Sequence, residues 1–371
     1  MYKKYLKRSL SLFVFIMFII ACINFIVDPG EIYFKRILAD RNSAEFSNKL
    51  FNSKHGVLQT GWNERLIKTI LAKEAGKFDC IVVGSSHMMQ ISSVRNTGNI
   101  NAQCNNLLNL GVSGGSIEDI SVFSYIILNN IQLPRQVFIG IDPWTLKFGM
   151  DMQYAAYKNY YDEMNLLLEK KAGGENVSYL SKIIQNLFNG EYFYHSLKSL
   201  VKITDKKKST HSIFSKEFMF PDENYSYTIG MKNHRVVLID GSYVYDKDLL
   251  YLQKNNKIKV GLGGGDYRLS GEIYDKLALI YLQKLIDLYK YNGVKVNLVL
   301  TPYHPNVFKR GETKAVKYFK VVETIIRKLS INNNLKIYGS YFADNVGCKE
   351  GDFLDFQHPL NDCLNKIDFS K

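Results

Sequence analysis

Five short apolar runs constrain the fold of this 371-residue chain more than any other feature. They cover residues 80–83, 107–110, 137–141, 296–300 and 335–338, and each gives way to glycine, proline or polar residues. Helical periodicity separates them at 116–130, 270–291 and 313–330, and another amphipathic segment, 62–76, precedes the first. Alternation of strands with helices predicts an α/β fold, with a parallel sheet covered on both faces.

The alternation stops for more than a hundred residues between the third and fourth runs. We expect an insertion at about 151–265, with helical patterns near 178–188 and 190–202 and an extra strand at 236–240. The glycine run at 261–266 lacks the Lys-Ser/Thr of a phosphate-binding loop, so it predicts a plain loop.

Residues 10–27, LSLFVFIMFIIACINFIV, carry no charge. At 1.5 Å per residue they extend roughly 27 Å, close to the thickness of the hydrocarbon core of a bilayer. Basic residues precede the stretch, and Asp28 and Glu31 follow it. The positive-inside rule therefore predicts a cytoplasmic tip and membrane anchor at 1–28, and an extracytoplasmic domain at 29–371.

Two interpretations of this anchor remain open. Ile19-Ile20-Ala21-Cys22 resembles a lipoprotein processing box, which would place a lipid on Cys22. Apolar sequence continues past Cys22 to Val27, and no clear small-residue cleavage site follows, which favours an uncleaved signal anchor.

The formal net charge of +13 indicates anionic surroundings. Nucleic acid is one such partner, but no basic cluster with interleaved aromatic residues marks a surface for it, and the run 206–208 is short enough for a solvated loop. An AT-rich genome produces the same excess of lysine. An extracytoplasmic location excludes nucleic acid as a partner and leaves wall polymers and lipid headgroups.

Four cysteines follow the anchor: Cys80, Cys104, Cys348 and Cys363. Their spacing does not match a zinc site, and nothing in the sequence indicates another metal or a cofactor. We interpret them as scattered buried thiols, while disulfides remain open for an extracytoplasmic protein.

The carboxyl ends of parallel strands meet at one rim of the sheet, where ligands bind. The residues that follow the five predicted strands are small, polar or ionisable, and they are 84–86, 109–115, 140–144, 301–305 and 352–359. We therefore expect the functional site at this rim.

A serine hydroxyl becomes a nucleophile when a base takes its proton and a third group orients that base. Asp355 and His358 are three residues apart, so a turn places the carboxylate beside the imidazole. The other ring nitrogen can then face a serine that follows the first strand. Asp352, six residues from His358, is the weaker candidate for the orienting carboxylate.

These residues resemble the SGNH (GDSL-like) hydrolase superfamily. Gly84-Ser85-Ser86 is similar to its first block, with Ser85 in place of the usual aspartate, and 109–114 is similar to its second. Asp355-Phe356-Gln357-His358 is similar to the fifth. The resemblance implies a three-layer, flavodoxin-like sheet over about 78–145 and 290–365. It also implies a triad of Ser86, His358 and Asp355, and an oxyanion hole formed by the N–H groups of Ser86 and Gly111.

The chain departs from this resemblance at the third block, Gly140-Ile141-Asp142-Pro143. Asp142 stands where the family has an asparagine that holds the oxyanion. A carboxylate there would repel the developing negative charge, so we expect Asp142 to be protonated, turned away or structural.

Within that superfamily the anchored chain resembles the D-alanyl-lipoteichoic acid transfer proteins and related O-acetylation proteins. The resemblance implies an acyl donor, a teichoic acid or exopolysaccharide as acceptor, and a multi-pass membrane O-acyltransferase as partner. It implies no cofactor or metal. The alternative is a non-catalytic member of the fold that binds an envelope polymer or supports such an acyltransferase.

Three further residues are candidates for substrate binding. His304 follows the fourth strand between two prolines, and His87 follows Ser86 directly, where a local structural role is the favoured interpretation. Trp144 and nearby tyrosines suit either a sugar-stacking platform or a helical core; these tyrosines are Tyr154, Tyr157, Tyr160 and Tyr161.

Overall fold

The computed structural model describes most of the two regions that carry the predicted strands and helices. The described residues are 2–27, 47–53, 56–59, 64–151, 153–169, 187–188, 190, 193–194, 196–197, 235–244, 274–309 and 313–371. Most of the predicted insertion, including its helical patterns, the run 206–208 and the glycine run 261–266, lies outside them.

The main sheet has five parallel strands, in the order β3-β2-β4-β7-β8. They are β2 (Cys80–Val83), β3 (Leu107–Asn109), β4 (Gln136–Gly140), β7 (Lys295–Leu300) and β8 (Lys336–Gly339). Numbered along the chain the order is 2-1-3-4-5, one of the two common orders of doubly wound sheets. Every predicted strand is confirmed to within one or two residues, because strands buried on both faces show as continuous apolar runs.

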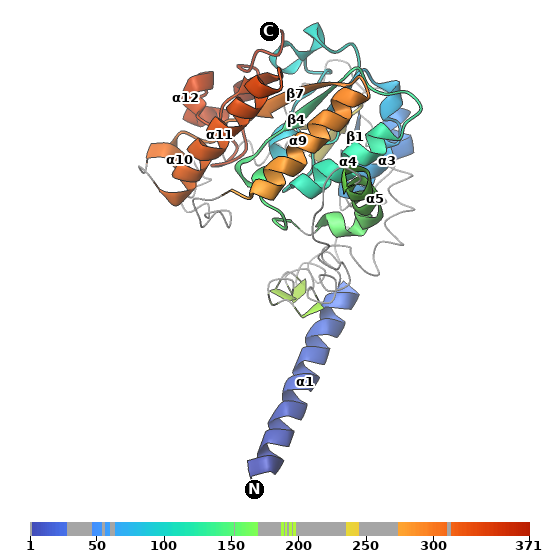
Figure 1. Cartoon of the computed structure of the whole chain (residues 1–371), viewed down its shortest axis with the longest axis vertical. Helices are drawn as coiled ribbons and strands as arrows, with labels where there is room; N and C mark the ends of the chain where they lie inside the picture. The colour runs from blue at the N-terminus through green and yellow to red at the C-terminus, as the bar shows by residue number, and fades with distance from the viewer. Residues whose placement is uncertain are drawn as a thin grey trace.

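The long helices pack on one face of the sheet, as Figure 1 shows for α4, α9 and α11. These helices are α3 (Glu64–Ala72), α4 (Ile117–Leu128), α9 (Lys276–Tyr291) and α11 (Lys314–Asn332). α4, α9 and α11 lie within the connections from β3 to β4, from β4 to β7 and from β7 to β8, and all three connections run in the same direction across the sheet. Because such crossovers are right-handed, they place these helices on the same face.

The opposite face is covered too, as expected, but by short segments. Short segments pack on Val82, Phe138 and Val299 there: the 3-10 segment η3 (Thr97–Ala102), α13 (Asn361–Leu364) and the chain up to Phe369. The connection from β2 to β3 is the only one within the main sheet that runs in the reverse direction, so its segment reaches this second face. Two other short helices are α10 (Asn306–Lys309) and α12 (Ala343–Val346).

A small antiparallel sheet lies beside the end of β3. Its strands are β1 (Gly56–Gln59), β5 (Arg235–Leu238) and β6 (Tyr243–Val244); β5 confirms the extra strand expected at 236–240. The buried Lys68 ammonium donates to the carbonyls of Asn109 and Gly241, at 2.7 and 2.6 Å, and so ties the two sheets together. Burial lowers the pKa of Lys68 to about 8.

One helix among the described residues, α1 (Tyr2–Val27), is long and apolar enough to cross a membrane. It extends away from the sheet (Figure 1), and most of its side chains are exposed. Cys22 lies within it as a free thiol.

The interpretation of the other cysteines as scattered thiols is wrong. Cys80 is bonded to Cys104, with the Cα atoms 5.7 Å apart, and Cys348 is bonded to Cys363, with the Cα atoms 5.1 Å apart. Their partners lie on segments that only the fold brings together, so the spacing along the chain did not reveal them.

Candidate active site

Ser86 lies in the turn that follows β2. Gly84 begins this turn with φ +148°, and a Cβ there would come within 2.8 Å of Met88 and 3.1 Å of the Gly140 backbone. Ser85 is fully buried, and its Oγ accepts the His87 N–H at 3.1 Å, which caps the 3-10 turn η2 (Ser86–Met88). Ser86 is partly exposed. The Ser85 hydroxyl therefore stabilises the turn, and the turn leaves Ser86 partly exposed.

The loop after β8 brings a base to this hydroxyl. His358 Nε2 lies 2.9 Å from Ser86 Oγ, although the two residues are 272 positions apart in the chain. His358 Nδ1 lies 2.8 Å from Asp355 Oδ2. Asp355 Oδ1 accepts the N–H groups of Gln357 and His358, both at 2.8 Å, which closes the tight turn predicted from the three-residue spacing.

The carboxylate of Asp355 is strongly held in its ionised form. Burial raises the pKa of Asp355, but the hydrogen bond from His358 and its electrostatic attraction, together with the hydrogen bonds from two backbone N–H groups, outweigh this effect and bring the pKa to about 2. An ionised Asp355 accepts the Nδ1 proton, so the Nε2 lone pair faces Ser86 Oγ. This arrangement allows the imidazole to take the hydroxyl proton.

Asp352 is engaged elsewhere. Its carboxylate accepts from the Lys366 ammonium and from the Lys349 N–H. The choice of Asp355 as the partner of His358 therefore agrees with the geometry.

The predicted oxyanion donor Gly111 does not fit its role. Its N–H donates to Asn109 Oδ1 at 2.8 Å, because the Asn109 side chain folds back over its own strand end. The Asn109 amide also donates to the carbonyls of Met88 and Ile91, and so fixes the segment after Ser86. Asn109 is therefore structural, and Gly111 completes its network.

Gly115 lies against the turn that carries Ser86. A Cβ on Gly115 would lie 2.5 Å from Gly84 O and 2.9 Å from Ser85 Cα. Among the described residues, no group accepts the N–H of Gly114 or the N–H of Ser86, which is the first of the 3-10 turn. These two N–H groups are therefore the candidate oxyanion donors.

Glu64 and Arg65, at the start of α3, hold the chain next to these glycines through Ser113. The Glu64 carboxylate accepts both the N–H and the hydroxyl of Ser113, and Arg65 donates to its carbonyl at 3.0 Å. The buried Arg65 guanidinium also forms a two-pronged ion pair with Asp119, at 2.8 and 3.0 Å. Neither residue belongs to a motif that marks a site in the sequence, although a charge next to the apolar face of a short amphipathic helix is a visible signal.

The structure turns Asp142 inward. Its Oδ1 lies 3.0 Å from His87 Nδ1 and accepts the Tyr303 hydroxyl at 3.3 Å. The side chains of His87 and Asp142 are 0% and 2% exposed, so neither reaches the surface where a substrate would bind. The His87 ring packs edge-on against the His358 ring at 5.2 Å, which leaves it the structural role favoured from the sequence.

His304 and Trp144 are also buried, and each donates a hydrogen bond to the backbone of a segment next to the site. His304 donates its N–H to Phe356 O at 3.2 Å, and burial lowers the pKa of its imidazole. Trp144 donates to Gly115 O at 3.0 Å. Tyr154 and Tyr157 are buried near α5 (Lys158–Glu169), a helix that the sequence did not predict, so they form core rather than a sugar platform.

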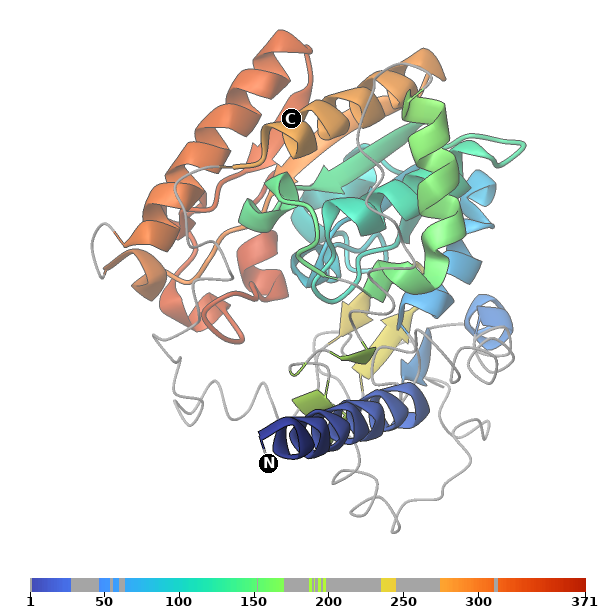
Figure 2. The ribbon, with the colours of Figure 1, turned by 60° about the horizontal axis from the view of Figure 1, so that its bottom comes forward.

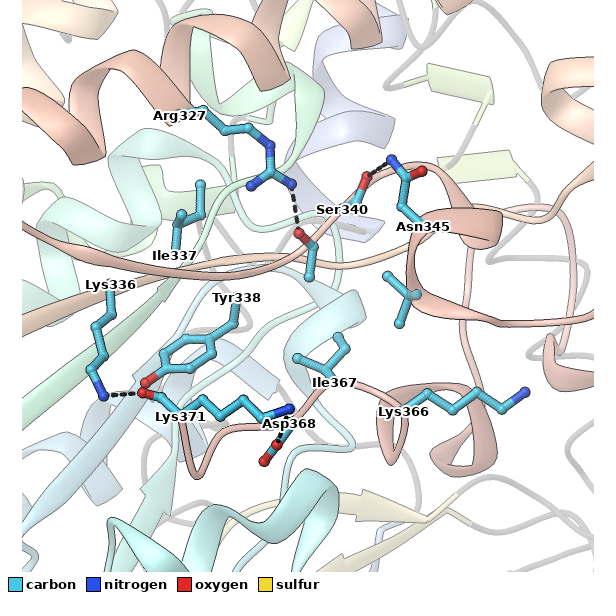
Figure 3. Close-up of a pocket in the computed structure, with 12 residues that line it drawn as sticks. Arg327, Lys336, Ile337, Tyr338, Ser340, Asn345, Lys366, Ile367, Asp368 and Lys371 are labelled. Atoms are coloured by element: carbon cyan, nitrogen blue, oxygen red, sulfur yellow. Dashed lines mark hydrogen bonds and ion pairs between the residues drawn. The ribbon is translucent and has the colours of Figure 1, made fainter.

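A cavity of about 490 Å³ lies along the outer edge of β8 (Figure 3). None of the predicted site residues lines it. Three of its four cationic side chains already have acidic partners: Arg327 pairs with Glu323, Lys366 with Asp352 and Lys371 with Asp368. The fourth, Lys336, donates to the Lys371 carbonyl oxygen. We therefore place the candidate chemistry at Ser86.

No protein-family model matches the chain, and no curated protein matches it. Within the described residues, no group of three or more His, Cys, Asp or Glu side chains is arranged to hold a metal ion. Fold and site together define an α/β protein in which a serine, a histidine and a carboxylate form one hydrogen-bonded series.

Proposed function

We propose that this protein is an extracytoplasmic serine acyltransferase or esterase of the SGNH type that acts on a cell-surface polymer. One observation carries the proposal. The Ser86 hydroxyl, the His358 imidazole and the Asp355 carboxylate are joined by two contacts, of 2.9 and 2.8 Å, at the rim of a parallel sheet.

The chemistry follows from these contacts. Ser86 Oγ attacks the acyl carbonyl while His358 Nε2 takes its proton. The N–H groups of Ser86 and Gly114 stabilise the oxyanion, and the protonated imidazole then gives its proton to the departing group. This leaves an acyl-Ser86 ester. A polymer hydroxyl, or water, attacks the ester with His358 again as base, which transfers the acyl group and restores the serine.

The strand order supports the SGNH assignment, because 2-1-3-4-5 is the flavodoxin-like order. The segments that resemble the first and fifth blocks meet at the site. The third block raised the objection that a carboxylate at position 142 would repel the oxyanion. The inward turn of Asp142 answers it, because the carboxylate contacts the buried His87 and Tyr303 side chains.

The proposed location rests on α1 and on the two disulfides. Disulfides persist in oxidising compartments, which supports a domain outside the cytoplasm. Teichoic acid or exopolysaccharide is the acceptor we propose there, with a multi-pass O-acyltransferase as the source of the acyl group.

The second candidate is a binding protein without catalysis. The absence of an asparagine at position 142 favours it, because one oxyanion donor of the family is missing. A fluorophosphonate probe separates the two candidates, since it reacts with an activated serine.

We expect the full chain, in detergent, to be labelled on Ser86. Ser86→Ala should abolish labelling and leave the thermal melt nearly unchanged, whereas the matched variant Ser85→Ala should keep it. In cells, Ser86→Ala should remove alkali-labile acyl groups from a surface polymer. An unlabelled wild-type protein, together with unchanged acyl content in the mutant, would identify the binding protein instead.

A further inference from the structure

A polar contact fixes part of the inserted region to the end of the membrane helix. Asn24 in α1 is 0% exposed, although the helix around it is largely exposed. Its Nδ2 donates to Leu187 O at 2.8 Å, and its Oδ1 accepts from Ser196 Oγ at 2.9 Å. Figure 1 shows the short pieces around these residues beside the C-terminal end of α1, and in the view of Figure 2 they lie between α1 and the strands of the small sheet.

The position of Asn24 in the helix sets the depth of this contact. Asn24 lies three residues before Val27, which is about 4.5 Å along the axis. The uncharged stretch that ends at Val27 is about as long as the hydrocarbon core is thick, so Asn24 lies at the boundary between acyl chains and headgroups. An amide at this depth needs hydrogen-bond partners. Leu187 and Ser196 supply them, and they must therefore lie at the same depth.

Three large side chains of the same pieces are left exposed. Phe188 is 44% exposed, Tyr194 60% and Leu197 41%. In α1 itself, Phe25 and Ile26 are exposed near the contact. Aromatic and apolar side chains at the level of the headgroups are typical of segments that lie in the membrane interface.

We propose that Phe188, Tyr194 and Leu197 form an interface patch that inserts into the acyl–headgroup boundary of the bilayer crossed by α1. The occupant is the lipid surface, because the helix that anchors the patch already lies in it. The patch gives the protein a second attachment point beside α1, which limits rotation of the domain about the helix axis. This holds for either orientation of α1 and does not depend on the chemistry at Ser86.

Quenching by brominated lipid tests the proposal. Full-length Tyr194→Trp protein is reconstituted in vesicles of phosphatidylglycerol and phosphatidylcholine in equal parts, with the phosphatidylcholine brominated near the top of its acyl chains. The matched control is Ile331→Trp, whose site is 78% exposed on α11, away from α1 in Figure 1. The wild-type emission is subtracted from both. We expect the added tryptophan at 194 to be quenched at least about twofold more than the one at 331.

Equal quenching at the two positions would overturn the proposal. Quenching that appears only at high protein density would also overturn it, because it would indicate a second copy of the chain on the patch. Asn24→Leu, added to Tyr194→Trp, removes both hydrogen bonds and keeps α1 apolar. We expect this change to weaken quenching at 194, and full quenching would refute the depth assigned through Asn24.

Discussion

Two histidine–aspartate pairs lie next to each other in this protein, and only one of them has its Nε2 beside a serine hydroxyl. His358 and Asp355 are 2.8 Å apart, with side chains 22% and 32% exposed. His87 and Asp142 are 3.0 Å apart, with side chains 0% and 2% exposed. The Nε2 of His358 meets Ser86 Oγ, whereas that of His87 has no hydrogen-bond partner among the described residues. Under the proposed function, the same two groups thus form a base in one place and a structural support in the other.

The two imidazole rings differ in exposure because different segments of the chain carry them. His87 follows Ser86 in a 3-10 turn, which directs its ring under the sheet rim, against Trp144 and Tyr303. His358 returns from a separate loop and approaches the serine from outside. A residue next to the serine in sequence is therefore poorly placed to act as its base, because the turn directs its side chain away from the serine hydroxyl.

The largest effect on turnover should come from a substitution in the partly exposed pair, His358 and Asp355. Asp355→Asn should lower turnover by about four powers of ten, because an amide stabilises the wrong tautomer of the base. Asp352→Asn is the matched control, since its carboxylate binds Lys366 instead, and it should cost far less. Steady-state hydrolysis of an aryl acetate measures both. The reverse ranking would mean that the wrong carboxylate has been assigned.

The buried pair should affect stability more than turnover. Asp142→Asn keeps an acceptor for His87 Nδ1 but loses the charge, so we expect the free energy of unfolding to fall by about 1–3 kcal/mol. Turnover should change by less than about tenfold, or 1.4 kcal/mol in the barrier. Denaturant unfolding and hydrolysis rates, measured on the same preparation, separate the two. Collapse of turnover in a stable variant would give Asp142 a direct role in the chemistry.

The smallest effect should be a pH dependence of stability. The pKa of Asp355 is about 2 in the folded chain, against about 3.9 in an unfolded one. Because the folded pKa is the lower, the ionised carboxylate stabilises the fold above pH 4, and this contribution disappears as the pH falls from about 4 to 2. The difference in melting temperature between wild type and Asp355→Asn should therefore narrow over this window. A constant difference would show that Asp355 keeps an ordinary pKa.

The sheet and the meeting of Ser86 with His358 could be predicted because both depend on short-range patterns. Buried strands read as apolar runs, and strand ends of one sheet share a rim. The choice between Gly111 and Gly114 depends on where the Asn109 side chain turns, and the sequence does not encode that locally. The Cys348–Cys363 pairing and the role of Arg65 likewise arise from three-dimensional proximity.

The disulfide between Cys348 and Cys363 encloses the loop that carries both Asp355 and His358. Closing a loop of this length stabilises a fold by about 3 kcal/mol. Ser86 lies in a second covalent ring, the one that Cys80 and Cys104 close. Under the proposed function, a reduced chain would hold neither the serine nor its base and orienter as firmly, so secretion into an oxidising space would itself complete the catalyst.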